Sequence, residues 1–75
     1  MYIFRSELLE HLCSIGLCPH VGPDGSVAIY GDHRTVMAVP DMRGGWHLEL
    51  GHSPRQIPTK CITAYALARS MRRRL

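Results

Sequence analysis

Acidic residues are absent from the end of this 75-residue sequence, since none follows Glu49. Residues 1–50 contain three arginines and six acidic residues, a net charge of −3, whereas residues 51–75 contain six basic residues and no acid, a net charge of +6. The six basic residues are Arg55, Lys60, Arg69, Arg72, Arg73 and Arg74. This split predicts that the basic segment binds a polyanionic partner, either a nucleic acid or an acidic protein surface.

A local explanation of the terminal arginines stays open. The segment "IPTKCITAYALARSMRRRL" predicts a helix, and the dipole of a helix stabilises cations near its C-terminus. Arg69, Arg72, Arg73 and Arg74 would then only form a solvated helix end. Because these arginines exceed what dipole compensation usually needs, we favour the binding interpretation.

Long apolar runs are also missing, and none approaches the length that crosses a membrane. The start, "MYIFRSELLEHL", lacks the basic residues and the long apolar stretch of a signal peptide. The cysteines are odd in number: Cys13, Cys18 and Cys61. We therefore expect a cytoplasmic protein with reduced thiols and no membrane partner.

Motifs of the common enzyme classes are absent: there is no Gly-rich phosphate loop, no carboxylate pair and no Ser-His-Asp set. His33 is the candidate considered for RNA cleavage, with Arg34 as the group that would stabilise the developing charge. A histidine in a turn is more often an ordinary surface residue. We therefore predict no catalytic residue and no cofactor.

A metal site is considered at "CSIGLCPH", which offers Cys13, Cys18 and His20, with Cys61 elsewhere in the chain. Structural zinc takes four cysteine or histidine ligands in a tetrahedron, and the C-x4-C-x-H spacing is not a standard knuckle. Cys13 and Cys61 each fall on the apolar face of a predicted helix, where cysteine usually behaves as a small hydrophobic residue. We predict no metal site, although the sequence leaves binding by Cys13, Cys18 and His20 open.

Hydrophobic periodicity predicts a single small α+β domain over residues 1–75, with the order α-β-β-β-α. The first helix is expected over residues 6–15, with Ser6 as its N-cap and Gly16 as its stop. Three strands are expected in "SVAIY", "RTVMAVP" and "WHLEL". Two amphipathic helices would then cover one face of a three-stranded antiparallel sheet.

Two connections carry their own signals. Pro23-Asp24-Gly25 predicts a turn before the first strand, because proline presets φ and glycine takes a positive φ. The segment "GHSPRQIP" is expected to be a loop, with Pro58 in the first turn of the second helix.

Alternation along "WHLEL" places Trp46 and Leu48 on the helix-covered face of the sheet. The middle strand can be placed in either parity. If Met37 and Val39 face outward, the sheet exposes an apolar patch that would suit a homodimer or another protein partner.

The second helix is expected to bury one stripe at 100° spacing. This stripe contains Cys61, Ala64, Tyr65, Ala68, Met71 and Leu75. Arg69 and Arg73 fall on one flank, Arg72 at the edge of the stripe and Arg74 on the other side. We therefore expect the arginines to fan out around the helix.

The segments "SELLEHLCSIGL", "GSVAIYGDHRTVMAVP" and "IPTKCITAYAL" resemble the three blocks of the HicA-type mRNA-interferase toxins. The resemblance implies an α-β-β-β-α fold similar to double-stranded RNA-binding domains. The catalytic histidine of that family follows its Gly-Ser pair, whereas Val27 and Ala28 follow Gly25-Ser26 here. This sequence also carries the additional segment "RGGWHLELGHSPR". These departures argue against nuclease activity.

Two functions follow from these observations. The first is a small non-catalytic module that binds RNA or DNA through its basic C-terminal helix and the loop at Arg55 and Lys60. The alternative is a compact protein-binding inhibitor or regulator, of the kind that phages and other mobile elements encode. It would act on an acidic protein surface. The basic C-terminal segment favours the first function.

Overall fold

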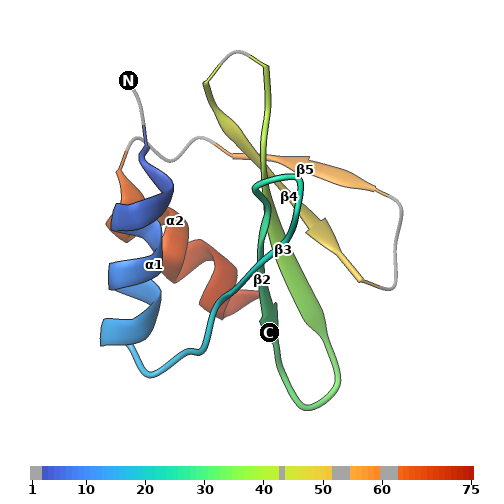
Figure 1. The fold of residues 1–75 in the computed structure, drawn as a ribbon. Helices are drawn as coiled ribbons and strands as arrows, with labels where there is room; N and C mark the ends of the chain where they lie inside the picture. Colours follow the sequence, from blue (N-terminus) through green and yellow to red (C-terminus); the bar gives the residue numbers. More distant parts are fainter. Residues whose placement is uncertain (1–2, 43, 52–54, 60–62) are drawn as a thin grey trace.

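The computed structural model describes residues 3–42, 44–51, 55–59 and 63–75. Its helices and strands follow the order α1 (Arg5–Ser14), β1 (His20–Val21), β2 (Val27–Tyr30), β3 (Thr35–Pro40), β4 (Trp46–Leu50), β5 (Gln56–Pro58) and α2 (Ala64–Arg73). The strands form one antiparallel sheet in the order β1-β2-β3-β4-β5. Both helices lie on the same side of this sheet (Figure 1). The predicted α+β class is confirmed.

The sheet has five strands and not the three predicted. The two additional strands are the edges β1 and β5, of two and three residues. Strand β1 lies in a segment rich in proline and glycine, and β5 ends in Pro58. Segments of two or three residues are too short to show an alternation of apolar and polar side chains. Proline, moreover, is typical of loops and edge strands.

Helix α1 starts earlier than its sequence indicates. Its N-cap is Phe4, with no side-chain cap, so the prediction of Ser6 as the cap is wrong. The predicted stop is confirmed, because Gly16 has a φ of +84° directly after the C-cap Ile15. The amide of Leu17 donates to the carbonyl of Leu12 at 3.0 Å, the pattern of a Schellman motif.

The predicted turn at Pro23-Asp24-Gly25 is also confirmed. Gly25 has a φ of +86°, and its amide donates to the carbonyl of Gly22 at 3.1 Å. The carboxylate Oδ1 of Asp24 accepts hydrogen bonds from the hydroxyl of Ser26 at 2.6 Å and from its amide at 3.0 Å. Both hydrogen bonds lower the pKa of Asp24 from its usual value of 3.8, and the bond from the Ser26 hydroxyl has the larger effect.

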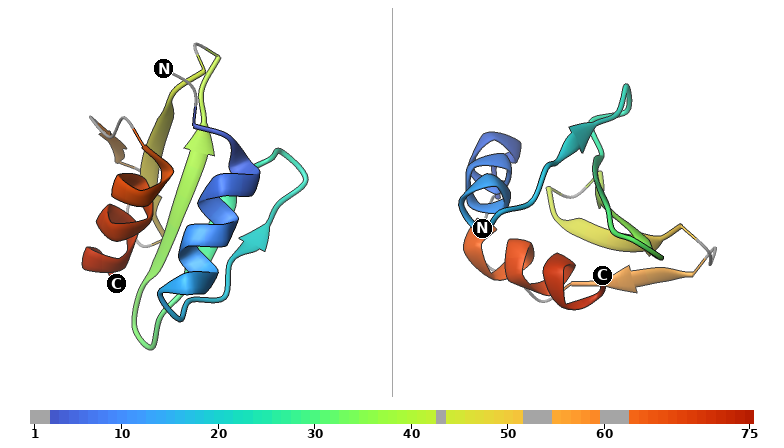
Figure 2. Two further views of the ribbon diagram at one scale, coloured as in Figure 1. Left: turned by 90° about the vertical axis from the view of Figure 1, so that its left-hand side faces the viewer. Right: turned by 90° about the horizontal axis from the view of Figure 1, so that it is seen from below.

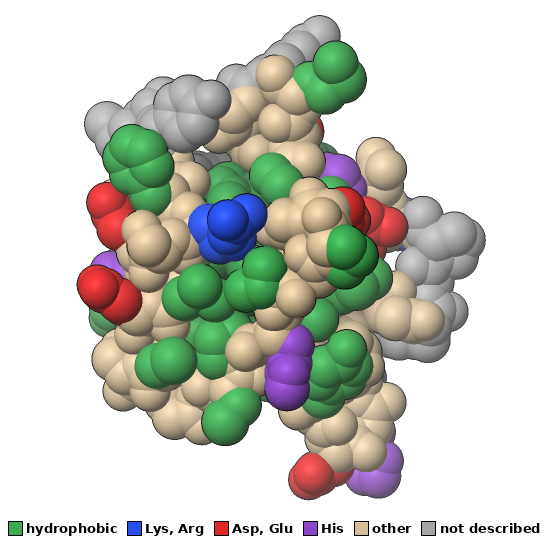
Figure 3. Space-filling view, in the orientation of Figure 1, with side chains coloured by type: hydrophobic (Ala, Val, Ile, Leu, Met, Phe, Trp, Pro, Cys, Tyr) green, Lys and Arg blue, Asp and Glu red, His purple; other side chains and the backbone are tan. Residues whose placement is uncertain are grey.

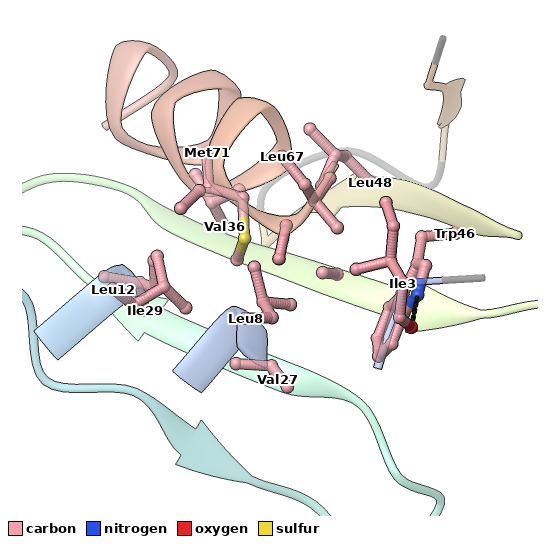
Figure 4. Packing of buried hydrophobic residues seen from close by; sticks show 13 residues of the cluster. Ile3, Leu8, Leu12, Val27, Ile29, Val36, Trp46, Leu48, Leu67 and Met71 are labelled. Carbon is pink, nitrogen blue, oxygen red and sulfur yellow. Dashed lines mark hydrogen bonds between the residues drawn. The ribbon is translucent and has the colours of Figure 1, made fainter. Parts of the chain in front are cut away.

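The core lies between the helices and the sheet (Figure 4). Its largest fully buried side chains are Leu8, Leu12, Ile29, Leu48, Leu67, Met71, Val27 and Val36. Trp46 lies at one end of this core, and its indole Nε1 donates to the carbonyl of Ile3 at 3.0 Å. The prediction that Trp46 and Leu48 face the helices is therefore confirmed.

Strand β5 determines the direction of α2. Along β5 the chain returns to the Trp46 end of the sheet, where Pro58 pairs with His47 and the hydroxyl of Thr59 donates to the carbonyl of Trp46 at 2.8 Å. Helix α2 then runs back toward the β2–β3 turn (Figures 1 and 2). A helix that followed Leu50 directly would start at the β2–β3 turn instead, because Leu50 pairs with Val36.

The start of α2 also differs from its prediction. Pro58 ends β5 and does not lie in the first turn of the helix. The N-cap is Thr63, whose hydroxyl accepts a hydrogen bond from the amide of Ala66 at 3.1 Å. A threonine cap of this kind stabilises a helix by about 1 kcal/mol.

Candidate nucleic-acid interface

Helix α2 has one buried and one exposed side. Its buried residues are Ala64, Leu67, Ala68 and Met71. Tyr65, Arg69, Arg72 and Arg73 are exposed. These four have the spacing i, i+4, i+7 and i+8, so they share one side of the helix. The sequence placed Tyr65 on the apolar stripe, and this is wrong, since Tyr65 is 49% exposed.

Three arginines of α2 line one hollow. Arg69, Arg72 and Arg73 surround about 290 Å³ together with Ile15, the C-cap of α1. Arg69 and Arg73 were expected on one flank of the helix, and Arg72 lines the same hollow. We call Arg69, Arg72 and Arg73, together with Tyr65, the α2 basic face.

Arg74 has a different environment from the α2 basic face. It is half-buried, and it lines a neighbouring hollow of about 350 Å³ with Ser70 and Arg73. Its Nε atom is buried without a hydrogen-bond partner.

Tyr65 ties the basic face to α1. Its hydroxyl accepts a hydrogen bond from Nη1 of Arg69 at 2.7 Å, and the Arg69 Cζ atom lies 5.5 Å from the centre of the Tyr65 ring. The ring also meets the imidazole of His11 edge-on, with centroids 5.6 Å apart and an angle of 76° between the planes. Arg69, Tyr65 and His11 thus form a chain of contacts from α2 to α1.

The arginines of the α2 basic face lack a carboxylate partner. Among the residues that the structure describes, Arg69, Arg72 and Arg73 take part in no ion pair. Arg69 and Arg73 are four residues apart, a spacing at which like charges on a helix repel. An anionic partner would relieve this repulsion.

One remaining basic candidate, Arg55, lies elsewhere. Arg55 is exposed and directly precedes β5 at the edge of the sheet, and it lines neither hollow of the α2 arginines. Lys60 lies outside the described residues. Among the described members of the predicted binding set, the structure brings together Arg69, Arg72 and Arg73, with Arg74 beside them.

His33 and Arg34 lie in the β2–β3 turn, which the amide of Gly31 closes by donating to the carbonyl of Arg34 at 2.7 Å. Both side chains are exposed. They line the largest of the hollows described here, about 660 Å³, which we call the turn hollow. Its lining residues are Leu17, Tyr30, Gly31, Asp32, His33, Arg34 and Leu75. His33 and Arg34 were considered together from the sequence, but nothing in the sequence indicated that Leu75 would line the same hollow.

The structure describes two of the three cysteines. Cys13 and Cys18 are exposed free thiols, so the placement of Cys13 on a buried stripe is wrong, and Cys61 lies outside the described residues. Within residues 3–42, 44–51, 55–59 and 63–75, no three Cys, His, Asp or Glu side chains lie close enough together to hold a metal ion.

The sheet face opposite the helices is open. Val36 and Ala38 are buried beneath the helices, so Thr35, Met37 and Val39 point the other way. The sequence left open which side chains of β3 face away from the helices, and the structure answers this. On the same face, His47 Nε2 lies 3.0 Å from Glu49 Oε2.

No protein-family model, curated protein or solved structure matches this chain. Among the described residues, neither helix is long and apolar enough to cross a membrane.

Proposed function

We propose that this protein is a small non-catalytic module that binds nucleic acid through the α2 basic face. The observation that carries this proposal is the convergence of Arg69, Arg72 and Arg73 on one hollow without a carboxylate partner among the described residues. Arginine presents a planar fork of donors that matches phosphate oxygens, and phosphate contacts dominate the affinity of proteins for nucleic acids.

Two further features support this assignment. Arg74 adds a fourth guanidinium, which lines the adjoining hollow with Ser70 and Arg73. Hydrophobic side chains gather between α1 and the β1–β2 edge in the view of Figure 3, which shows a single Lys or Arg patch. Basic side chains are therefore sparse on that side of the molecule.

A binding role without cleavage fits the positions after Gly25-Ser26. In the resemblance to the HicA-type toxins, Val27 and Ala28 follow the Gly-Ser pair in place of a catalytic histidine, and both are buried aliphatic residues of β2. Neither side chain can transfer a proton. The proposal therefore assigns no chemical step to this protein.

The test is direct binding to fluorescein-labelled RNA and DNA, as single strands and as duplexes, measured by fluorescence anisotropy. We expect the triple variant Arg69→Gln, Arg72→Gln, Arg73→Gln to bind about tenfold or more weakly. Each phosphate contact releases counterions from the nucleic acid and so favours binding, and the variant loses these contacts. Glutamine and arginine have similar helix propensities, so the variant should stay folded.

Arg5→Gln is the matched control. Arg5 is exposed and lies at the other end of the sheet, where a Cβ atom on Gly25 would be 3.0 Å from its Nη1. This variant removes one positive charge without touching the α2 basic face, and it should bind like the wild-type protein. Failure of the wild-type protein to bind any of the nucleic acids would overturn the proposal.

The open sheet face favours a second candidate, a protein-binding inhibitor or regulator. Met37 and Val39 are only half-buried there, and Tyr30 is 63% exposed. An apolar face of this kind is typical of protein interfaces. Under this alternative Met37→Glu would abolish capture of a protein partner, whereas under the first proposal it would leave the binding of nucleic acid unchanged.

A further inference from the structure

The turn hollow lies directly beyond the basic end of α2. Leu75, which lines it, follows Arg74 in the chain, and a Cβ atom on Gly31 would lie 3.2 Å from Leu75 Cδ2. Arg73 and Arg74 line the neighbouring hollow. A strand whose phosphates contact the α2 basic face can therefore continue over the helix end into the turn hollow.

The lining of the turn hollow differs from that of the α2 basic face. Tyr30, His33 and Arg34 carry flat groups, and all three are exposed. Leu17 and Leu75 add half-buried apolar surface. Proteins bind unpaired bases by stacking them on aromatic rings or guanidinium planes, next to groups that hold the phosphate.

Tyr30 is ordered at this position before binding. Its ring meets the imidazole of His20 with centroids 5.1 Å apart and an angle of 65° between the planes. Asp32 is the acidic residue of the hollow, and its carboxylate disfavours a phosphate nearby. A phosphate is therefore placed toward Arg34, while Asp32 can accept a hydrogen bond from an amino group of a base.

We propose that the turn hollow holds one unpaired nucleotide of the bound strand. Its base packs against the flat groups and the two leucines, and its phosphate faces Arg34. This inference rests on the proposed function and names its substrate class, single-stranded nucleic acid. A duplex cannot fill the hollow without unstacking a base, which costs free energy.

The test compares fluorescein-labelled single strands of roughly 16 nucleotides, one RNA and one DNA, with a duplex of the same sequence. We expect the wild-type protein to bind at least one single strand about fivefold or more tighter than the duplex, the scale of a single stacked base. Tyr30→Ala and Arg34→Gln should each remove most of this preference and leave duplex binding unchanged. Tyr30→Phe should keep the preference.

Arg5→Gln again serves as the control, and thermal melts show that each variant is folded. Tighter binding of either the RNA or the DNA strand supports the proposal and identifies the chain that enters the hollow. If the wild-type protein prefers single strands but Tyr30→Ala and Arg34→Gln bind like it, or if it binds duplex equally well, this inference is overturned while the proposed function stands. If it binds none of the probes, both are overturned.

Discussion

Leu75 packs against Gly31, so that the end of α2 meets the β2–β3 turn: a Cβ atom on Gly31 would lie only 3.2 Å from Leu75 Cδ2 and 3.2 Å from the carbonyl oxygen of Arg34. These residues are far apart in sequence. Their contact depends on β5, which returns the chain to the far end of the sheet before α2 begins. It brings the α2 arginines and the turn residues into one region.

This contact is tested by Gly31→Val. We expect the variant to lower the free energy of unfolding by about 1–3 kcal/mol, because the larger side chain overpacks the helix end and the turn. Leu75→Ala in the same chain should recover part of the loss, since it removes one of the two neighbours. Urea titrations of the single and double variants measure the coupling, and strictly additive losses would show that the two residues do not touch.

Leucine truncations test the core. Leu12 and Leu48 are both fully buried, one from α1 and one from β4. Leu12→Ala and Leu48→Ala should each lower the free energy of unfolding by about 2–5 kcal/mol through lost burial and the cavity left behind. Unchanged denaturation midpoints for either variant would contradict the packing in Figure 4.

The Asp24–Ser26 turn predicts a pH dependence. Hydrogen bonds from Ser26 depress the pKa of Asp24 in the folded state below its usual value of 3.8. The ionised carboxylate therefore stabilises the fold above that value, and this contribution disappears as the pH falls through the folded-state pKa. Asp24→Asn should be less stable than the wild-type protein near neutral pH, and the two stabilities should converge in acid. A difference that does not depend on pH would contradict the role of the charge.

The exposed thiols provide a further test. Because Cys13 and Cys18 are exposed, both should react with a thiol reagent in the folded protein at rates close to those of a free cysteine. Cys13→Ser should change the free energy of unfolding by less than about 0.5 kcal/mol, as is usual for a surface substitution. Mass spectrometry after brief labelling identifies the modified residues. If Cys13 did not react, its exposure would be contradicted and the predicted burial would be correct.

Much of the fold follows from local signals in the sequence. The Gly16 stop, the Pro23-Asp24-Gly25 turn and the alternation at Trp46 each depend on a few neighbouring residues, and the structure confirms all three. Such signals involve residues that are close in sequence, so each can be recognised from the sequence alone. The end of α1 at Gly16 and the three longer strands are of this kind.

The candidate site could be predicted only in part. The charge asymmetry identified the α2 arginines, and their spacing places Arg69, Arg72 and Arg73 on one side of the helix, but the hollow that they share with Ile15 depends on how α1 packs beside α2. The exposure of Cys13 and Tyr65 likewise depends on how the helices pack. The turn hollow was missed because β5, too short to show a pattern, determines where Leu75 lies.

The most direct test of the α2 basic face is the salt dependence of binding to a single-stranded oligonucleotide. For the wild-type protein, the logarithm of the association constant should fall linearly with the logarithm of the salt concentration, with a slope of about −0.7 for each phosphate contacted. Replacing Arg69, Arg72 and Arg73 with glutamine should make this slope shallower by about two. An unchanged slope in the folded triple variant would contradict the assignment and indicate that these arginines only form a solvated helix end.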